Sequence, residues 1–176
     1  WGTFLFEHQL TDLQIENGTL KAIEINHTEW MPVQVLVAAI GHSARDTFFM
    51  LQEKELEMEA KAFAIGVRIE HPQEWIDRAQ YGEDAGNPLL PVADYALTYN
   101  DRSTGRGVYS FCMCPGGQVV AAASEKERTV TNGMSEYARS GENINGGLLV
   151  NVTPEDFGGS HPLAGIAFQR RLAESA

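Results

Sequence analysis

The hydrophobic and polar positions of the first forty residues alternate in short runs that predict β-strands. These runs are residues 3–6, 10–15 and 20–25, and the Asn-Gly pair at 17–18 is a two-residue turn signal between the last two. The next run, residues 33–40, is nearly continuous in Val, Leu, Ala and Ile. Such a run is typical of a strand that is buried on both faces of a parallel sheet covered by helices.

Directly after this run, the sequence predicts a helix over residues 44–57. Ser43 is a residue type expected at an N-cap, and Asp46 completes a box-like arrangement in which each side chain accepts an amide hydrogen of the first turn. Apolar side chains then recur along one stripe, with charged residues on the other side. The predicted strand and helix meet at Gly41.

The rest of the chain predicts clustered strands and two further helices. The expected strands are residues 63–69, 97–99, 107–113, 118–123 and 147–152, and the expected helices are residues 73–79 and 162–172. Turn signals occur at 115–117 (Pro-Gly-Gly) and 132–133 (Asn-Gly), and residues 135–145 are expected to form a surface loop. This order indicates an α+β fold with a mainly antiparallel sheet and flanking helices.

Composition is typical of a soluble globular protein and argues against several classes of partner. Of the 176 residues, 43% are hydrophobic and 21% are charged, and no apolar run approaches the ~20 residues that cross a bilayer. The formal net charge of -11 repels nucleic-acid phosphates and anionic membranes. Two cysteines make no secreted disulfide framework and no leader is recognisable, which favours the cytoplasm. Trp1 in place of Met indicates a chain cut or processed from a longer one.

The strand–helix junction supplies the first candidate site, with the residues Gly41, His42 and Ser43. Glycine lets a ligand approach the backbone closely, and a helix start offers free amide hydrogens and a positive dipole to an anion. These three residues are therefore candidates for contacting a cofactor. An ordinary turn between a strand and a helix explains the same pattern equally well.

The second candidate site is the strand predicted at 63–69 and its continuation. Arg68 and Glu70 alternate with Ile69, so they share one face of the strand, and His71 follows at its end. An inward-facing Arg–Glu pair would orient a polar substrate or the edge of an anionic ring. The alternative, a structural ion pair at the rim of the sheet, is the commoner arrangement.

The third candidate site contains the two cysteines, Cys112 and Cys114, just before a Pro-Gly-Gly sequence. In a strand their side chains point to the same face, and a disulfide between them would be strained. Three interpretations stay open: small buried hydrophobic side chains, a thiolate couple acting with a flavin, or metal ligands. Burial is the base expectation for free cysteine, and the scattered histidines argue against a metal site.

Two amide-rich segments, residues 132–135 and 143–145, are explained by turn geometry, and their side chains could also donate to a flavin or substrate carbonyl. The sequence contains no G-x-G-x-x-G after a strand, no Walker loop and no G-x-S-x-G elbow. The residues alone therefore indicate a soluble α+β domain with a strand end that is a candidate for facing a ligand.

Four segments in this order resemble a known family. They are residues 39–48 (Ala-Ile-Gly-His-Ser-Ala-Arg-Asp-Thr-Phe), 66–72 (Gly-Val-Arg-Ile-Glu-His-Pro), 109–117 (Tyr-Ser-Phe-Cys-Met-Cys-Pro-Gly-Gly) and 132–135 (Asn-Gly-Met-Ser). Together they resemble the bacterial FAD-dependent dehydrogenases, also labelled NAD(FAD)-utilising dehydrogenases. The resemblance extends from the first strand to Arg171 and so covers essentially the whole chain.

The resemblance implies a longer protein in which this α+β domain is inserted into a Rossmann-type FAD-binding fold. The nucleotide-binding part, with its fingerprint glycines, is absent from this sequence. Residues 1–42 would border the FAD-binding fold and residues 43–176 would form the substrate-side domain, or 1–176 would form one compact unit. The implied partner is the FAD-binding portion of the same polypeptide, and NAD(P) is a further candidate cofactor.

The function predicted on this basis is transfer of hydride or electrons between FAD and a nicotinamide or small organic substrate. The junction at 41–43 is assigned to the cofactor side, and Arg68, Glu70, Cys112 and Cys114 are predicted as catalytic residues on the substrate side. The fragment is expected to be inactive alone. The alternatives are a non-catalytic module that binds a small molecule or a protein, and a thiol redox unit.

Overall fold

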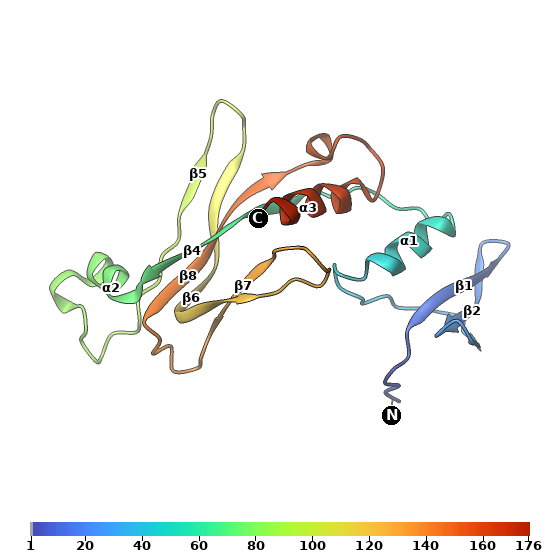
Figure 1. Cartoon of the computed structure of the whole chain (residues 1–176), viewed down its shortest axis with the longest axis horizontal. Coiled ribbons are helices and arrows are strands. Elements are labelled where there is room, and N and C mark those ends of the chain that lie inside the picture. Colours follow the sequence, from blue (N-terminus) through green and yellow to red (C-terminus); the bar gives the residue numbers. More distant parts are fainter. Residues whose placement is uncertain (1) are drawn as a thin grey trace.

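The chain is built around two antiparallel sheets, seen in a computed structural model that describes residues 2–176. The three-stranded sheet contains, in spatial order, β1 (Leu10–Glu16), β2 (Thr19–Ile25) and β3 (Glu29–Pro32). The five-stranded sheet has the order β4 (Phe63–Pro72), β8 (Asn143–Val152), β6 (Gly107–Ala121) and β5 (Thr98–Asn100), with β7 (Thr131–Ser135) also paired to β6. The predicted α+β fold with mainly antiparallel strands is confirmed (Figure 1).

The helices of the described residues are α1 (Arg45–Glu53), α2 (Gln73–Tyr81), η1 (Gly82–Asp84), η2 (Pro154–Phe157) and α3 (Ala164–Ser175). In Figure 1, α2 lies at one end of the molecule, the three-stranded sheet lies at the other, and α1 and α3 lie between them. The predicted helix at 73–79 is confirmed and ends at Gly82, whose φ of 60° stops a right-handed helix. The predicted C-terminal helix is confirmed as α3.

An aromatic cluster holds α3 against one face of the five-stranded sheet. The ring of Phe63 on β4 stacks on Phe157 with a centroid distance of 4.9 Å, and Phe168 of α3 lies 5.5 Å from Phe157. Side chains alternate between the two faces of a strand, and the pairing of β4 with β8 is regular throughout. Arg68 and Glu70 therefore point to the face opposite this cluster, which we call the open face.

The long strand β6 contains a β-bulge against β8. Phe111 pairs with Gly147 and Cys114 pairs with Asn145, so β6 has one extra residue between the two pairs. Within this bulge Cys112 has a φ of 51°, a left-handed value that is uncommon for a residue with a side chain. Because a bulge interrupts the alternation of side chains, the regular spacing assumed for Cys112 and Cys114 does not apply, and the two differ in burial: Cys112 is exposed and Cys114 is buried.

A second bulge follows, where Gly116 has a φ of 55°. The turn predicted at 115–117 is therefore wrong: the chain bulges without reversing, and the two strands predicted around it form one element. The Asn-Gly pair at 132–133 is also not a turn, because it lies inside β7 and pairs with β6. β8 begins at Asn143, earlier than the sequence predicted.

Two predicted strands do not form. Residues 3–6 and 33–40 have no strand pairing within the part of the chain that the structure describes. The side chains of Val35 and Val37 are 79% and 83% exposed, the opposite of the predicted burial. A strand requires a hydrogen-bonded neighbour along its length, and within residues 2–176 this apolar run has one only at Val33.

The helix α1 is shorter than the helix predicted at 44–57. No side chain caps its start, so the predicted Ser43 cap is wrong. Asp46 instead accepts a hydrogen bond of 2.7 Å from Gln9 Nε2, which ties the helix to the chain before β1. The helix ends before Glu55, whose φ of 56° lies outside the right-handed helical region.

A carboxylate fixes the short helix η2 between β8 and α3. Asp156 Oδ2 accepts hydrogen bonds from the Thr153 backbone amide at 2.8 Å and from Arg106 Nη1 at 3.0 Å, and Asp156 Oδ1 contacts Arg106 Nη2. The Arg106 guanidinium beside it, together with the Thr153 amide, lowers the pKa of Asp156 from its usual 3.8 to about 2. The charged form of Asp156 is therefore favoured in the folded chain.

We expect Asp156→Asn to lower the Tm at neutral pH, because the amide loses the charge-assisted pair with Arg106. A pKa that is lowered by folding gives stability that is present above the ordinary value of 3.8 and is lost as the pH falls through about 2. The difference in Tm between the native chain and Asp156→Asn should therefore shrink as the pH falls through this range. Scanning calorimetry across the range tests this, and a difference that does not change with pH would contradict it.

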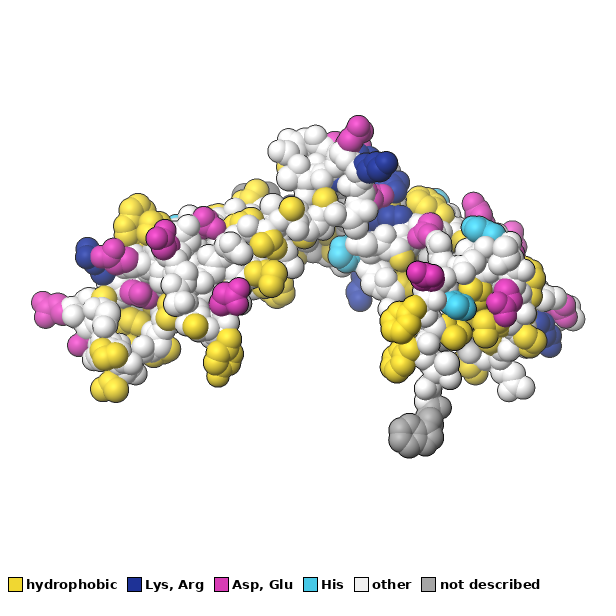
Figure 2. Space-filling model, turned by 60° about the horizontal axis from the view of Figure 1, so that its bottom comes forward, with side chains coloured by type: hydrophobic (Ala, Val, Ile, Leu, Met, Phe, Trp, Pro, Cys, Tyr) yellow, Lys and Arg dark blue, Asp and Glu magenta, His cyan; other side chains and the backbone are white. Residues whose placement is uncertain are grey.

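The chain exposes more surface than a compact protein of its size. Its solvent-accessible area is 12816 Å² at a mass of 19.4 kDa, whereas a compact monomer of that mass exposes roughly 8,500 Å². Large hydrophobic side chains that are between 79% and 89% exposed include Phe4, Phe6, Val35, Val37 and Leu89. Figure 2 shows an arched surface with hydrophobic side chains gathered at both of its ends.

Among residues 2–176, no helix has both the length and the apolar character needed to cross a membrane.

Candidate functional site

Arg68 is the centre of a polar cluster on the open face of the five-stranded sheet. Its Nη1 donates to Asn145 Oδ1 at 2.5 Å and to the Cys112 carbonyl at 3.3 Å, and its Nη2 donates to the same carbonyl at 3.4 Å. The bulge in β6 makes this carbonyl available to the guanidinium. Both acceptors are neutral, and within residues 2–176 no acidic side chain lies at ion-pair distance from Arg68.

Asn145 and Gly133 fix the position of the Arg68 guanidinium. Asn145 is fully buried, and its Nδ2 has no hydrogen-bond partner among the described residues. A Cβ atom added at Gly133 would lie 2.1 Å from Arg68 Nη1 and 2.3 Å from Asn145 Oδ1, so only glycine leaves the guanidinium room. An unpaired buried donor costs about 1–3 kcal/mol, and native proteins keep few of them. The Asn145 amide therefore marks this cluster as a candidate functional position.

The two cysteines differ in their access to solvent. Cys114 is buried, and its Sγ lies 3.9 Å from Arg68 Nη1, whereas Cys112 is exposed and joins the cluster only through its backbone carbonyl. Both thiols are free. The expectation of a buried cysteine is confirmed for Cys114 and is wrong for Cys112, which is exposed within the bulge. The described residues contain no group of three or more His, Cys, Asp or Glu that could hold a metal ion.

Glu70 and His71 do not pair with Arg68. Glu70 Oε1 accepts a hydrogen bond of 2.8 Å from Asn143 Nδ2, next to the cluster on the same face. His71 points to the other face, where its Nε2 lies 3.1 Å from the Tyr95 hydroxyl, and burial raises the pKa of Tyr95. The ion pair between Arg68 and Glu70 that the sequence suggested is thus not formed among the described residues.

A hollow of about 540 Å³ adjoins this cluster where β6, β7 and β8 meet. Asn143 is part of its lining and also donates to Glu70, so the hollow and the open face share this residue. The other lining residues include Gly116, Gly117, Ser135, Ser140 and Glu142. A small polar molecule in the hollow would therefore lie next to the face that carries Arg68.

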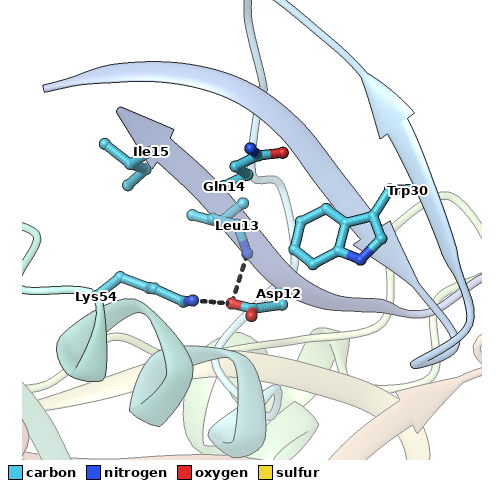
Figure 3. Close-up of a pocket in the computed structure, with 6 residues that line it drawn as sticks. All are labelled: Asp12, Leu13, Gln14, Ile15, Trp30 and Lys54. Carbon is cyan, nitrogen blue, oxygen red and sulfur yellow. Dashed lines mark hydrogen bonds and ion pairs between the residues drawn. The ribbon is translucent and has the colours of Figure 1, made fainter. Parts of the chain in front are cut away.

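Another hollow, of about 550 Å³, lies on the three-stranded sheet (Figure 3). Lys54, which directly follows α1, contacts Asp12 Oδ1 at 2.6 Å at the edge of this hollow, and Trp30 forms part of its wall. The two charges at this edge compensate each other. None of the residues predicted as a site lines this hollow, so we do not assign it a function.

The residues predicted on the cofactor side are Gly41, His42 and Ser43, and they lie in an exposed turn before α1. None of their hydrogen bonds reaches the Arg68 cluster. Gly41 has a φ of 69°, which explains why glycine stands there. Neither hollow is lined by these residues. A dinucleotide pyrophosphate needs several converging amides at the start of a helix, and this open turn does not provide them. At this turn the described residues therefore do not fit FAD by themselves.

The chemistry available at the cluster is recognition of an anionic or carbonyl group. Arg68 supplies a positive charge that its neighbours orient without neutralising, and Cys114 supplies a nearby thiol. Sequence reasoning identified Arg68 but assigned Asn145 and Gly133 to turns. Interpreting residues 143–147 (Asn-Ile-Asn-Gly-Gly) as a strand would have placed the side-chain amides of Asn143 and Asn145 on one face. That pattern was the signal in the sequence for a polar site on β8.

The fold and the site together define a class: an antiparallel α+β domain with an arginine-centred polar cluster and extensive exposed apolar surface. The chain belongs to the family described as FAD-dependent protein, C-terminal domain-like, which it matches over residues 62–176. A Clostridium beijerinckii protein that bears the name "Uncharacterized protein" is 54% identical over 175 residues, 99% of this chain and 33% of that protein. The chain thus spans about a third of the length of this relative. The resemblance is confirmed at the level of an FAD-dependent family.

Proposed function

We propose that this chain is the substrate-side domain of a longer flavin-dependent oxidoreductase. The parent protein would transfer hydride or electrons between FAD and a nicotinamide or small organic substrate. FAD would supply the redox chemistry, and it would be bound chiefly by the portion of the polypeptide that lies outside this chain. The family match supports the involvement of a flavin, and the length of the relative supports the existence of a longer polypeptide.

The observation that carries the substrate-side role is the charge of Arg68. A half-buried guanidinium without an acidic partner among residues 2–176 is suited to bind a carboxylate, a phosphate or an anionic ring edge. Asn145 and the Cys112 carbonyl would hold the guanidinium in one orientation before the ligand arrives. This pre-organisation reduces the entropy lost on binding.

The other predicted residues have supporting roles in this proposal. Glu70 would orient Asn143 at the rim of the hollow, and the Cys114 thiol would lie beside the group that Arg68 binds. The turn at 41–43 would contact the cofactor side only when the rest of the polypeptide is present. Residues 1–42 would then border the FAD-binding portion, and residues 43–176 would form the substrate-side domain.

The proposal is tested by titrating FAD into the purified longer polypeptide and into the 176-residue chain, with flavin absorbance and fluorescence as readouts. We expect saturable binding by the longer polypeptide and none by the chain, because the turn at 41–43 offers too few converging amides. Bleaching of the bound flavin by NADH or NADPH without oxygen would then identify a nicotinamide donor. Circular dichroism of the 176-residue chain serves as the control that it is folded.

Each outcome of the titration has a different meaning. Saturable binding of FAD by the 176-residue chain would overturn the assignment of FAD to the rest of the polypeptide. Failure of the longer polypeptide to bind FAD would refute the flavoprotein proposal and leave the non-catalytic binding module as the better interpretation. Binding of FAD without reduction by either nicotinamide would direct the search to small organic substrates.

A further inference from the structure

The segment at residues 33–40 leaves almost all of its backbone groups unpaired. The Val33 amide donates to the Lys21 carbonyl at 3.0 Å, which continues the edge of the three-stranded sheet by one bond. Beyond it, no backbone group of residues 34–42 makes a backbone hydrogen bond within the described chain. Natural proteins usually cover, shorten or charge such an edge, because it can pair with another chain.

The side chains of this segment are also unlike those of an exposed loop. Val35 and Val37 are 79% and 83% exposed, whereas Leu36 between them is only partly exposed. The segment carries no charge from Val33 to Ile40. An uncharged row of valines beside unpaired amides has none of the features that protect a natural edge strand from other chains.

We infer that residues 33–40 add a strand to the edge of a β-sheet in the remainder of the longer polypeptide, where Val35 and Val37 become buried. We assign the sheet that pairs with this segment to the longer polypeptide, because this chain spans only 33% of its relative. The accessible area, well above that of a compact monomer, also favours a covering surface. The inference rests on the proposed function only because it takes the pairing sheet to be part of the longer polypeptide.

This assignment explains why residues 33–40 are apolar and yet exposed in the isolated chain. The hydrophobic pattern is the signature of a strand in a covered sheet, and the neighbouring strands lie in another part of the polypeptide. Main-chain hydrogen bonds to that sheet would supply affinity, and Val35 and Val37 would set the register by filling pockets on one of its faces.

Hydrogen–deuterium exchange of the longer polypeptide, followed by mass spectrometry, tests the inference. We expect the amides of residues 34–40 to exchange at least about 100-fold more slowly than those of the loop at 57–62, which make no backbone hydrogen bond within the described chain, because paired amides exchange only after the sheet opens. Residues 19–25 of β2 provide the slow reference in the same molecule. Exchange of residues 34–40 as fast as the loop would overturn the inference.

A matched pair of variants separates this segment from general surface effects. We expect the double change Val35→Asp and Val37→Asp to abolish the protection of residues 34–40, whereas Leu89→Asp, at an 89% exposed position, should leave it unchanged. If the double variant does not fold, the exchange measurement on the native polypeptide decides alone. Protection that appears only in a dimer by light scattering would overturn the inference in favour of a second copy as the occupant.

Flavin content is measured separately on the same samples. Protection of residues 34–40 without bound flavin would uphold the strand and refute the flavoprotein proposal. Bound flavin without protection of residues 34–40 would uphold the flavoprotein proposal and refute the strand.

Discussion

Replacing Arg68 with methionine in the longer polypeptide is expected to slow the reduction of its bound flavin by NADH or NADPH by about 10- to 100-fold. A hydrogen bond to a charged group contributes about 1.5–3 kcal/mol, which corresponds to this range of rates. Methionine keeps much of the apolar stem of Arg68 while it removes the charge and the donors. The loss should therefore reflect recognition of an anionic group and not a gap in the sheet surface. Anaerobic stopped-flow absorbance of the flavin measures it.

Two further variants make this prediction specific to the site. Arg78→Met removes an exposed arginine of α2 that pairs with Glu74, and it should leave the rate unchanged. Gly133→Ala keeps the charge but introduces a methyl group where the Arg68 guanidinium lies, so it should also slow the reaction. Unaltered reduction in Arg68→Met and in Cys114→Ala would remove both residues from the proposed substrate side.

Gly116→Ala is expected to lower the free energy of unfolding of the 176-residue chain by about 2–4 kcal/mol. Two effects combine: alanine is strained in the left-handed conformation of this residue, and its methyl group overpacks the site. The φ of Gly116 is 55°, and an added Cβ atom would lie 2.0 Å from the Arg139 carbonyl oxygen, which belongs to the backbone and cannot rotate away. The Gly116 amide also donates to the buried Gln73 side chain at 2.9 Å. Relief of the clash by a backbone shift would therefore loosen the contact between β6 and α2.

Urea unfolding followed by circular dichroism measures this change through the midpoint concentration, provided that the slope stays constant. Gly159→Ala is the matched control, because its added Cβ atom meets nothing within 4 Å. We expect the control to change the stability by a few tenths of a kcal/mol at most. A similar small effect in Gly116→Ala would show that the bulge tolerates a side chain.

The parts of the fold that the sequence predicted correctly depend on local signals. The hairpin of β1 and β2 follows from the Asn-Gly turn at 17–18 and the alternating runs around it. The helix α2 follows from Pro72 before its start and Gly82 after its end. These signals act over a few residues, so they operate in the same way whatever the rest of the protein contains.

The wrong predictions depend on neighbours that are distant in sequence or absent from the chain. Residues 33–40 have the composition of a buried strand, but burial requires a partner that residues 2–176 do not contain. The Pro-Gly-Gly sequence at 115–117 suggested a reversal, and pairing with β8 on one side and β7 on the other keeps the strand continuous. For the same reason the contacts of Arg68 were unpredictable, since Asn145 and Gly133 are brought to it by strand register.

The two bulges of β6 also constrain how this sequence can change in length. The first bulge moves the open face from odd to even positions, so that Phe111 and Cys114 both point to it, and the second moves it back to odd positions at Gly117. Loss of the extra residue of one bulge would restore a regular ladder and leave the side chains beyond it on their present faces. Loss of a residue from a regular part of β6 would instead invert every side chain beyond it. Single-residue changes in the length of β6 should therefore be tolerated at the two bulges and not in the regular stretches on either side of them.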